Sequence, residues 1–414
     1  MTAILPVEHQ DPAARYAAVR AQTEALAAPL SAEDCALQSM PDASPVKWHL
    51  AHTSWFFETF VLGGEPEKAA RFPQFRVLFN SYYVGVGERH PRPERGLLSR
   101  PSLEEVREYR RHVDERMLAL FRTAAWRERG ALIELGLNHE QQHQELILTD
   151  VKHLLSRNPL LPAYAKGVFS PEQPAKPAAW RRFPAGVREI GYGGPGFAFD
   201  NEQPRHRVFA AAFDIADRLV TNADYVTFID DGGYRRPELW LSEGWELCRA
   251  QGWNAPLYWR DGSEFTLRGA RAIDPAQAVA HVSYFEADAY ARWAEARLPT
   301  EAEWEISAQG EPLEGNLPLA GNFLESGRLH PGAGRAHCFG DLWQWTSSAY
   351  APYPGFRAAS GAVGEYNGKF MVNQYVLRGG SCATPASHLR ASYRNFFPAA
   401  ARWQFSGVRL ARDA

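Results

Sequence analysis

Through residues 1–157, apolar side chains recur three or four positions apart, which is the spacing of one face of an α-helix. One of these segments begins with Ser102 and has Glu105 three residues later, the capping-box pattern of a helix N-terminus. The segments that follow the helical pattern are 11–28, 46–62, 102–121 and 127–156. Four helices of this length predict a four-helix bundle.

The pattern changes after residue 157. Residues 158–184 contain six prolines, a composition that predicts a linker. Beyond it, short alternating runs at 205–216 and 374–384 predict strands, whereas 285–296 and 301–309 predict short helices. The sequence therefore predicts an α plus α+β protein, with a helical domain (1–157), a proline-rich linker (158–184) and an α+β domain (185–414).

Composition narrows the classes of function. The 45 Lys and Arg residues against 48 Asp and Glu residues give a formal net charge of −3, without the basic excess typical of nucleic-acid binding. No run of 18 apolar residues is present, and the N-terminus carries charges where a signal peptide has an apolar stretch. Four scattered cysteines lack metal or disulfide spacing. We therefore expect a cytoplasmic protein with no nucleic-acid partner and no membrane segment.

Two histidines lie four residues apart in the helical segment NHEQQHQE. At 3.6 residues per turn, His139 and His143 share one face, so that both imidazoles can bind one ion. The alternative is a pair of histidines on a solvent-exposed helix surface. The flanking apolar residues Leu137, Leu146 and Ile147 favour a buried face, where unpaired imidazoles are costly. We therefore predict a metal site.

The third metal ligand is expected from another helix. His153 lies ten residues after His143, about 280° around the helix from it, and faces elsewhere. The second helical segment offers His49 and His52, and we favour His52 because it lies deeper among apolar and aromatic residues. The motif also matches the zincin pattern HExxH, in which Glu140 would activate water on zinc. Three neutral imidazoles suit either iron or zinc.

Several motifs, in order along the chain, resemble one enzyme family. LAHTSWFFE (50–58), FNSYYVGVGERHPRPERGLLSRP (79–101) and HEQQHQE (139–145) resemble the DinB-like helical bundle of the ergothioneine-biosynthesis iron sulfoxide synthases, close relatives of which are the selenoneine synthases. FGDLWQWTSSAY (339–350) and YRNFFPAAARWQFSGVRLA (393–411) resemble their second domain. That domain is related to formylglycine-generating (sulfatase-modifying) enzymes and has a C-type-lectin-like fold. The chain is identified as a member of this family.

The resemblance implies a reaction. In this family three histidines, which fall on His52, His139 and His143 here, hold non-heme Fe(II). The substrate is hercynine, the trimethylammonium betaine of histidine, and O2 is the oxidant. The imidazole C2 is joined to the sulfur of cysteine or γ-glutamylcysteine or, in selenoneine synthases, to the selenium of a selenosugar. The resemblance leaves the donor open.

The resemblance also implies residues that act around the metal. Gln142 is expected to hydrogen-bond the imidazole of the substrate. Tyr82 and Tyr83 match active-site tyrosines of the shorter bacterial branch, where a phenol can supply a proton or a hydrogen atom. Since adjacent residues usually point to different sides, one of the two is expected to reach the metal. Arg92, and after it Arg95, are candidates for binding the carboxylate of an amino-acid donor.

In the second domain, the resemblance implies substrate contacts on the segment YRNFFP. Asn395 is expected to hydrogen-bond hercynine, and Phe396 and Phe397 to face its trimethylammonium group, which favours aromatic surfaces. Branches of the family have Trp-Asp where this chain has Phe396-Phe397. Two other functions stay open: a sugar-binding or metal-binding module without chemistry, and a zinc hydrolase with Glu140 as its base.

Overall fold

The computed structural model describes residues 11–63, 71–167, 169, 176–314, 317–318, 320–333 and 338–414. The chain divides into two compact units. The first unit comprises Met1–Leu160 together with Ala359–Tyr366, and the second comprises Leu161–Ala358 with Asn367–Ala414. A short segment from late in the chain therefore belongs to the N-terminal unit.

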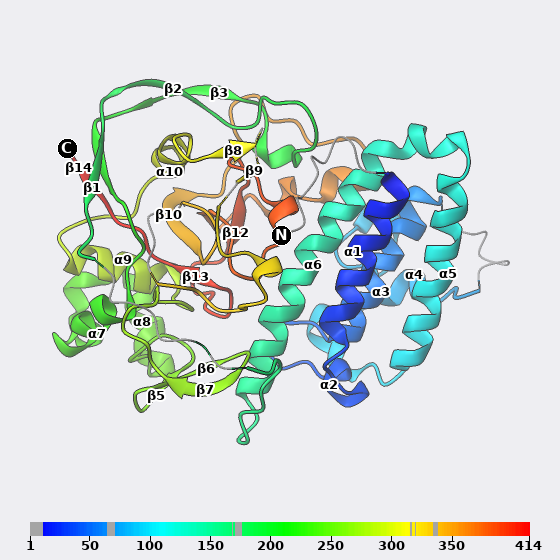
Figure 1. Cartoon of the computed structure of the whole chain (residues 1–414), viewed down its shortest axis with the longest axis horizontal. Coiled ribbons are helices and arrows are strands. Elements are labelled where there is room, and N and C mark those ends of the chain that lie inside the picture. The colour runs from blue at the N-terminus through cyan, green and yellow to red at the C-terminus, as the bar shows by residue number, and fades with distance from the viewer. Residues whose placement is uncertain are drawn as a thin grey trace. The chain divides into compact units, whose positions relative to one another are not determined.

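Within its described residues, the first unit is a bundle of four long helices, as the sequence predicts (Figure 1). These helices are α1 (Pro12–Ala27), α3 (Val46–Phe56), α5 (Leu103–Phe121) and α6 (Gly130–Ser156). A π-helical turn, η2 (Phe57–Val61), continues α3. Shorter helices are α2 (Ala32–Ala36), α4 (Phe75–Leu78) and the 3₁₀ turns η3 (Val84–Val86), η4 (Arg92–Leu97), η5 (Ala124–Arg129) and η10 (Ala362–Glu365).

Local sequence explains where these helices begin and how closely they pack. Ser102 and Glu105 form the predicted capping box at the start of α5. At Gly136 in α6, a Cβ atom would lie 2.6 Å from the ring of Phe57, so a glycine is needed for this approach. The close approach of α6 to α3 and η2 brings His139 of α6 beside His52 of α3.

The second unit combines short helices with small sheets, which confirms the predicted α+β class. Strands β1 (Trp180–Phe183), β4 (Phe213–Ala216) and β14 (Ala411–Asp413) form one sheet, in the order β1-β4-β14. A second sheet consists, in order, of β12 (Asn395–Phe397), β11 (Tyr375–Arg378), β10 (Trp343–Ala349) and β13 (Ser406–Gly407). Smaller sheets pair β2 (Gly186–Ile190) with β3 (His206–Ala210), β5 (Trp259–Arg260) with β6 (Ser263–Thr266) and β7 (Gly269–Ala272), and β8 (Leu313–Glu314) with β9 (Leu317–Pro318).

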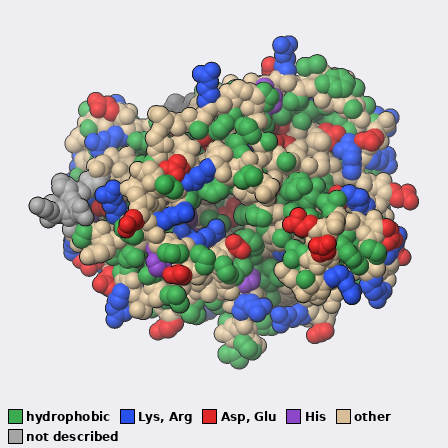
Figure 2. All heavy atoms as spheres, turned by 180° about the vertical axis from the view of Figure 1, so that it is seen from behind, with side chains coloured by type: hydrophobic (Ala, Val, Ile, Leu, Met, Phe, Trp, Pro, Cys, Tyr) green, Lys and Arg blue, Asp and Glu red, His purple; other side chains and the backbone are tan. Residues whose placement is uncertain are grey.

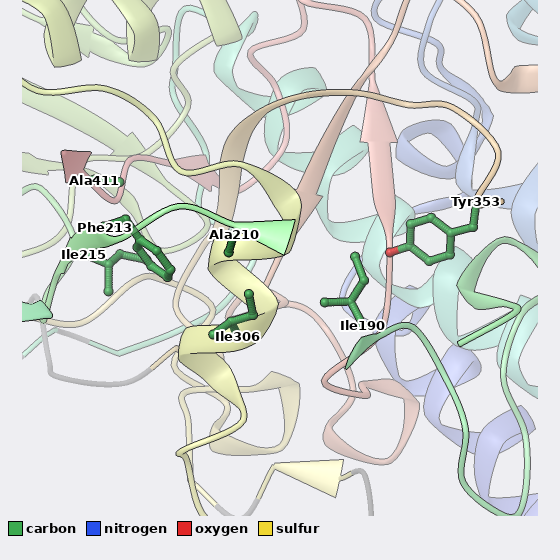
Figure 3. Close-up of a cluster of buried hydrophobic side chains, with 7 residues drawn as sticks. All are labelled: Ile190, Ala210, Phe213, Ile215, Ile306, Tyr353 and Ala411. Carbon is green, nitrogen blue, oxygen red and sulfur yellow. The ribbon is translucent and has the colours of Figure 1, made fainter. Parts of the chain in front are cut away.

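The described residues of the second unit include four α-helices, which are α7 (Asn222–Asp230), α8 (Ser242–Gln251), α9 (Tyr284–Trp293) and α10 (Glu301–Ala308). Three of them, α7, α9 and α10, begin at a Ser or Thr cap, whereas the cap of α8 is Leu241. Capping boxes start α9 and α10, the two helices predicted from the sequence. Side chains of β2, β3, β4, α10 and β14 and of one loop residue, Tyr353, meet in a buried cluster (Figure 3), whose other members are Ile190, Ala210, Phe213, Ile215, Ile306 and Ala411.

The segment predicted as a linker, residues 158–184, includes a strand. Trp180–Phe183 forms β1 and pairs with β4, because its aromatic residues supply strand propensity that the proline count does not reveal. Residues 168 and 170–175 of this segment lie outside the described residues.

Two surface properties bear on partners. No helix among the described residues is long and apolar enough to cross a membrane. On the face shown in Figure 2, Lys and Arg side chains are interspersed with Asp and Glu side chains, in keeping with the net charge of −3. This face therefore presents no large area of a single charge.

Candidate metal centre

Three buried imidazoles meet between α3 and α6. His52 Nε2 and His143 Nε2 each lie 3.1 Å from His139 Nε2. Two nitrogens bound to one ion at about 2.1 Å lie about 3.0 Å apart at a right angle and about 3.4 Å apart in a tetrahedron. Among the described residues, this is the cluster of histidine, cysteine and carboxylate side chains that could hold a metal ion. The predicted triple-histidine site is therefore present, and its residues fit a divalent metal.

The protonation of the three histidines suits metal binding, which requires neutral imidazoles. Burial lowers the pKa of His139 to about 3. Burial also lowers the pKa of His52 and of His143 well below the usual value, and the neighbouring His139 lowers both further. All three rings are therefore neutral at pH 7.

His52 is held in one orientation. Its Nδ1 lies 2.6 Å from the carbonyl oxygen of Phe79, which can only accept, so Nδ1 carries the proton. Nε2 then presents its lone pair to the other two histidines. The rings of Trp48 and Trp55 stack with the His52 ring at centroid distances of 4.5 and 5.5 Å. These contacts fix the plane of the imidazole before any metal binds.

His49 and His153, the two other histidines weighed as ligands, lie outside the Nε2 cluster. His49, the alternative third ligand, places its Nδ1 2.8 Å from Nδ1 of His143, behind the ligand and away from the Nε2 cluster. His153 forms a hydrogen bond with Ser39, in which His153 Nδ1 and Ser39 Oγ are 2.7 Å apart. The geometry therefore supports His52, and not His49, as the partner of His139 and His143.

Tyr82 and Tyr83 lie in the loop between α4 and η3. Their rings stack at a centroid distance of 4.5 Å, and their hydroxyl oxygens are 3.4 Å apart. Tyr83 is fully buried and Tyr82 is half-buried. Burial raises the pKa of Tyr83 well above the usual value, and Tyr82 and Tyr366 raise it further. The Tyr83 phenol therefore keeps its proton at pH 7.

The sequence did not point to Tyr366, which belongs to the segment 359–366 of the first unit. Its hydroxyl donates a hydrogen bond to Oε1 of Gln142, and its ring lies 5.7 Å from that of His139. The same segment is anchored by Glu365, whose carboxylate accepts from the backbone N–H groups of Val84 (3.0 Å) and Gly85 (2.7 Å). Gln142, predicted to contact the substrate, is therefore already oriented by a phenol beside the histidines.

The two candidate arginines differ in their surroundings. Arg95 is buried, with its guanidinium 3.4 Å from the ring centre of Trp48 and its Nη1 2.9 Å from Ser44 Oγ. Burial lowers the pKa of Arg95 to about 8, and the charge of Arg92 adds to the effect. Arg95 thus lacks a full counter-charge, and among the described residues its Nε has no partner. Arg92 is exposed and donates to the backbone carbonyl of Asp42. The geometry favours Arg95 over Arg92 for binding an anion.

Asn395, Phe396 and Phe397 form strand β12 of the second unit. Because successive strand residues point to opposite faces, Asn395 and Phe397 share a face and Phe396 lies on the other. Phe396 stacks on Tyr350 at a centroid distance of 4.0 Å, whereas Phe397 lies 6.0 Å from Trp403. The strand geometry therefore disfavours the expectation that both phenylalanines face one cation.

Glu140, the middle residue of the HExxH pattern, faces away from the histidine cluster. Its carboxylate binds Arg20 and Arg110, each at 2.9 Å, and accepts from Thr23 Oγ1 at 2.7 Å. Burial alone would raise the pKa of Glu140, but the two guanidinium groups outweigh it and lower the pKa to about 2. A carboxylate so occupied cannot serve as the base of a zinc hydrolase.

We expect Glu140→Gln to lower stability rather than remove chemistry. Breaking a buried ion pair from one side costs about 3–5 kcal/mol of unfolding free energy, because buried charges lose their partner. The matched control is Glu134→Gln on the same helix, whose pair with Arg15 is more exposed than the Glu140 pairs and should be worth less, about 1 kcal/mol. Urea unfolding of both variants measures the difference. Because the native pKa of Glu140 is depressed, its contribution is lost as pH falls from the unfolded pKa near 4.5 toward 2. Equal stability of the two variants would contradict the assignment.

Comparison with known proteins identifies the family. The DinB superfamily profile matches residues 15–147, and the sulfatase-modifying factor enzyme 1-like domain profile matches residues 167–414. The hercynine oxygenase of Mycolicibacterium thermoresistibile is 35% identical, with 90% of this chain and 88% of that protein covered. The hercynine oxygenase of Mycobacterium tuberculosis is also 35% identical, with 97% and 98% covered. Ergothioneine biosynthesis protein 1 of Schizosaccharomyces pombe is 28% identical over 52% of this chain and 28% of its own length.

These matches extend over nearly the whole chain and carry both predicted domain types in the predicted order. The chain belongs to the hercynine oxygenase family. The family assignment made from the sequence motifs is thereby confirmed.

Proposed function

We propose that this protein is an Fe(II)-dependent and O2-dependent enzyme that joins a chalcogen atom to C2 of the imidazole of hercynine. The observation that carries the proposal is the buried, neutral cluster of His52, His139 and His143, in a chain related to hercynine oxygenases. Three imidazoles on one side of an ion leave positions open for substrates. A zinc hydrolase is disfavoured because Glu140 is held by Arg20 and Arg110.

Bound Fe(II) would supply the activation of O2 and the electron transfers of the reaction. With a thiol donor, the C2–H and S–H hydrogens leave as water with one oxygen atom of O2, and the other oxygen forms the sulfoxide. Gln142, oriented by Tyr366, would hydrogen-bond the imidazole of hercynine. The phenols of Tyr82 and Tyr83 would supply a proton at neutral pH.

The remaining contacts concern the donor and the trimethylammonium group. We assign to Arg95 the binding of an anionic or hydroxyl-rich donor, since its buried guanidinium lacks a full counter-charge. Asn395 and Phe397 are proposed to contact hercynine from one face of β12. The donor is cysteine or γ-glutamylcysteine in a sulfoxide synthase, and a selenosugar in the alternative, a selenoneine synthase.

Anaerobic reconstitution tests this proposal. Protein loaded with Fe(II) is mixed with hercynine and then exposed to O2 with cysteine, γ-glutamylcysteine or a selenosugar, and products are identified by mass spectrometry. A C–S product with a thiol assigns the sulfoxide synthase activity, whereas a C–Se product confined to the selenosugar assigns the alternative. Zn(II)-loaded protein is the matched control and should form neither. Absence of product with every donor would overturn the proposal.

We expect Phe397→Ala to narrow the preference for hercynine over histidine. A desolvated contact between a cation and an aromatic face is worth about 0.5–2 kcal/mol, equivalent to about a 2-fold to 30-fold change in relative affinity. Calorimetric titration of the anaerobic Fe(II) protein with each ligand gives the ratio. Phe396→Ala is the matched control, because Phe396 stacks on Tyr350 and should affect stability more than selectivity. An unchanged ratio in Phe397→Ala would contradict the contact.

A further inference from the structure

Two buried residues that the reaction does not use line up behind a proposed metal ligand. His49 Nδ1 lies 2.8 Å from His143 Nδ1, and His49 Nε2 lies 3.1 Å from Asp150 Oδ2. His49 is 2% exposed and Asp150 is 5% exposed. A chain of hydrogen bonds therefore runs from a carboxylate through His49 to the far side of His143.

The direction of each hydrogen bond follows from the groups involved. Asp150 Oδ2 also lies 2.8 Å from the backbone nitrogen of Ser44, which can only donate, so Oδ2 is an acceptor. His49 must then donate from Nε2 to Asp150. In its neutral form His49 has a lone pair on Nδ1, which accepts from Nδ1–H of His143. His143 is thereby left with its lone pair on Nε2, the atom that faces His139.

We propose that Asp150 and His49 are positioning residues that set the tautomer of His143, so that its Nε2 is ready to bind the metal. We call this hydrogen-bonded chain of Asp150, His49 and His143 the relay. It keeps the proton of His143 on Nδ1, as the carbonyl of Phe79 keeps the proton of His52 on Nδ1. Outer partners of this kind orient a metal-binding imidazole and raise its basicity. The inference rests on the proposed function to the extent that the three histidines bind a metal.

Substitutions at His49 separate the relay from simple packing. His49→Phe keeps an aromatic ring but removes both nitrogens, whereas His49→Gln keeps an acceptor and a donor in a different shape. His153→Gln is the matched control, because His153 is on α6 but outside the relay. The probe is Co(II), titrated into each purified metal-free protein, with visible absorption giving the Kd and circular dichroism reporting the fold. His139→Ala tests whether the triad is the metal site.

We expect His49→Phe to raise the Kd for Co(II) by about 10-fold to 100-fold, the range typical for loss of an outer partner. Asp150→Asn should raise it by about 10-fold through loss of the negative charge. His49→Gln should stay closer to the unmodified protein than His49→Phe does, and His153→Gln should match it. A Kd in His49→Phe equal to that of the unmodified protein, or a His49→Gln variant as weak as His49→Phe, would overturn the relay. If His139→Ala bound Co(II) as tightly as the unmodified protein, the metal-site proposal itself would fail.

Discussion

Replacing any one of His52, His139 and His143 by alanine is expected to abolish retention of Fe(II) and, with it, product formation. Each imidazole would supply one of three protein ligands, and the three candidate ligand atoms lie within 4.8 Å of one another. The loss should exceed the roughly 10-fold to 100-fold weakening that follows removal of an outer partner. Iron content after gel filtration and the yield of hercynine product in single-turnover mixtures provide the measurement.

The control for this experiment is His153→Ala, which removes a histidine of α6 that bonds Ser39 and lies apart from the cluster. Its iron content should equal that of the unmodified protein. Normal iron content and turnover in His52→Ala would contradict the assignment of His52 as the third ligand and would favour His49 instead. Thermal unfolding distinguishes loss of metal from loss of fold.

The choice between His49 and His52 shows how far the sequence alone could go. The two residues are three apart, so both project toward α6 from neighbouring positions on α3. His52 contacts His139 through the Nε2 atoms that form the cluster. His49 instead contacts His143 through Nδ1, the ring nitrogen that does not belong to the cluster. Which role each takes depends on how α3 packs against α6, a tertiary contact that includes the close approach of Phe57 to Gly136.

The position of Tyr366 could not be predicted from the periodicity of the sequence. It is 224 residues from Gln142, the residue its hydroxyl contacts, and it follows a short 3₁₀ turn with no helical or strand pattern. Its position depends on Glu365, whose carboxylate binds two backbone N–H groups of the Tyr83–Gly85 loop. Backbone groups carry no sequence signal, so this contact could come only from the structure.

For the residues of β12, in contrast, the sequence alone could have predicted the side-chain arrangement. Side chains along a strand alternate between its two faces, so the adjacent residues Phe396 and Phe397 are expected on opposite faces. The expectation that both contact one cation followed the family resemblance instead of this period. The pairing of Val376 with Phe396 and of Tyr375 with Phe397 makes the separation explicit.

The Tyr82→Phe/Tyr83→Phe double variant is expected to lower kcat by about 10²-fold to 10⁴-fold, the usual contribution of a general acid, and to leave the KM for hercynine nearly unchanged. Phenylalanine preserves the stacked rings and removes only the two hydroxyl groups, which lie 3.4 Å apart. Since burial raises the pKa of Tyr83, the phenol is protonated throughout the neutral range, and the effect should not vary between pH 6 and 8. The single variants then show which of the two hydroxyls supplies the proton.

Tyr366→Phe is the matched comparison, because it also removes a single phenol hydroxyl, from a ring that lies beside His139, but with a different expected consequence. Its hydrogen bond orients Gln142, so its loss should raise the KM for hercynine more than it lowers kcat. Steady-state kinetics of all four variants, with product ratios from mass spectrometry, separate the two roles. Full activity and an unchanged product ratio in the double variant would refute the proton-donor role of Tyr82 and Tyr83. If only Tyr366→Phe then lost kcat, the donor would be Tyr366, the phenol in contact with both Gln142 and the ring of His139.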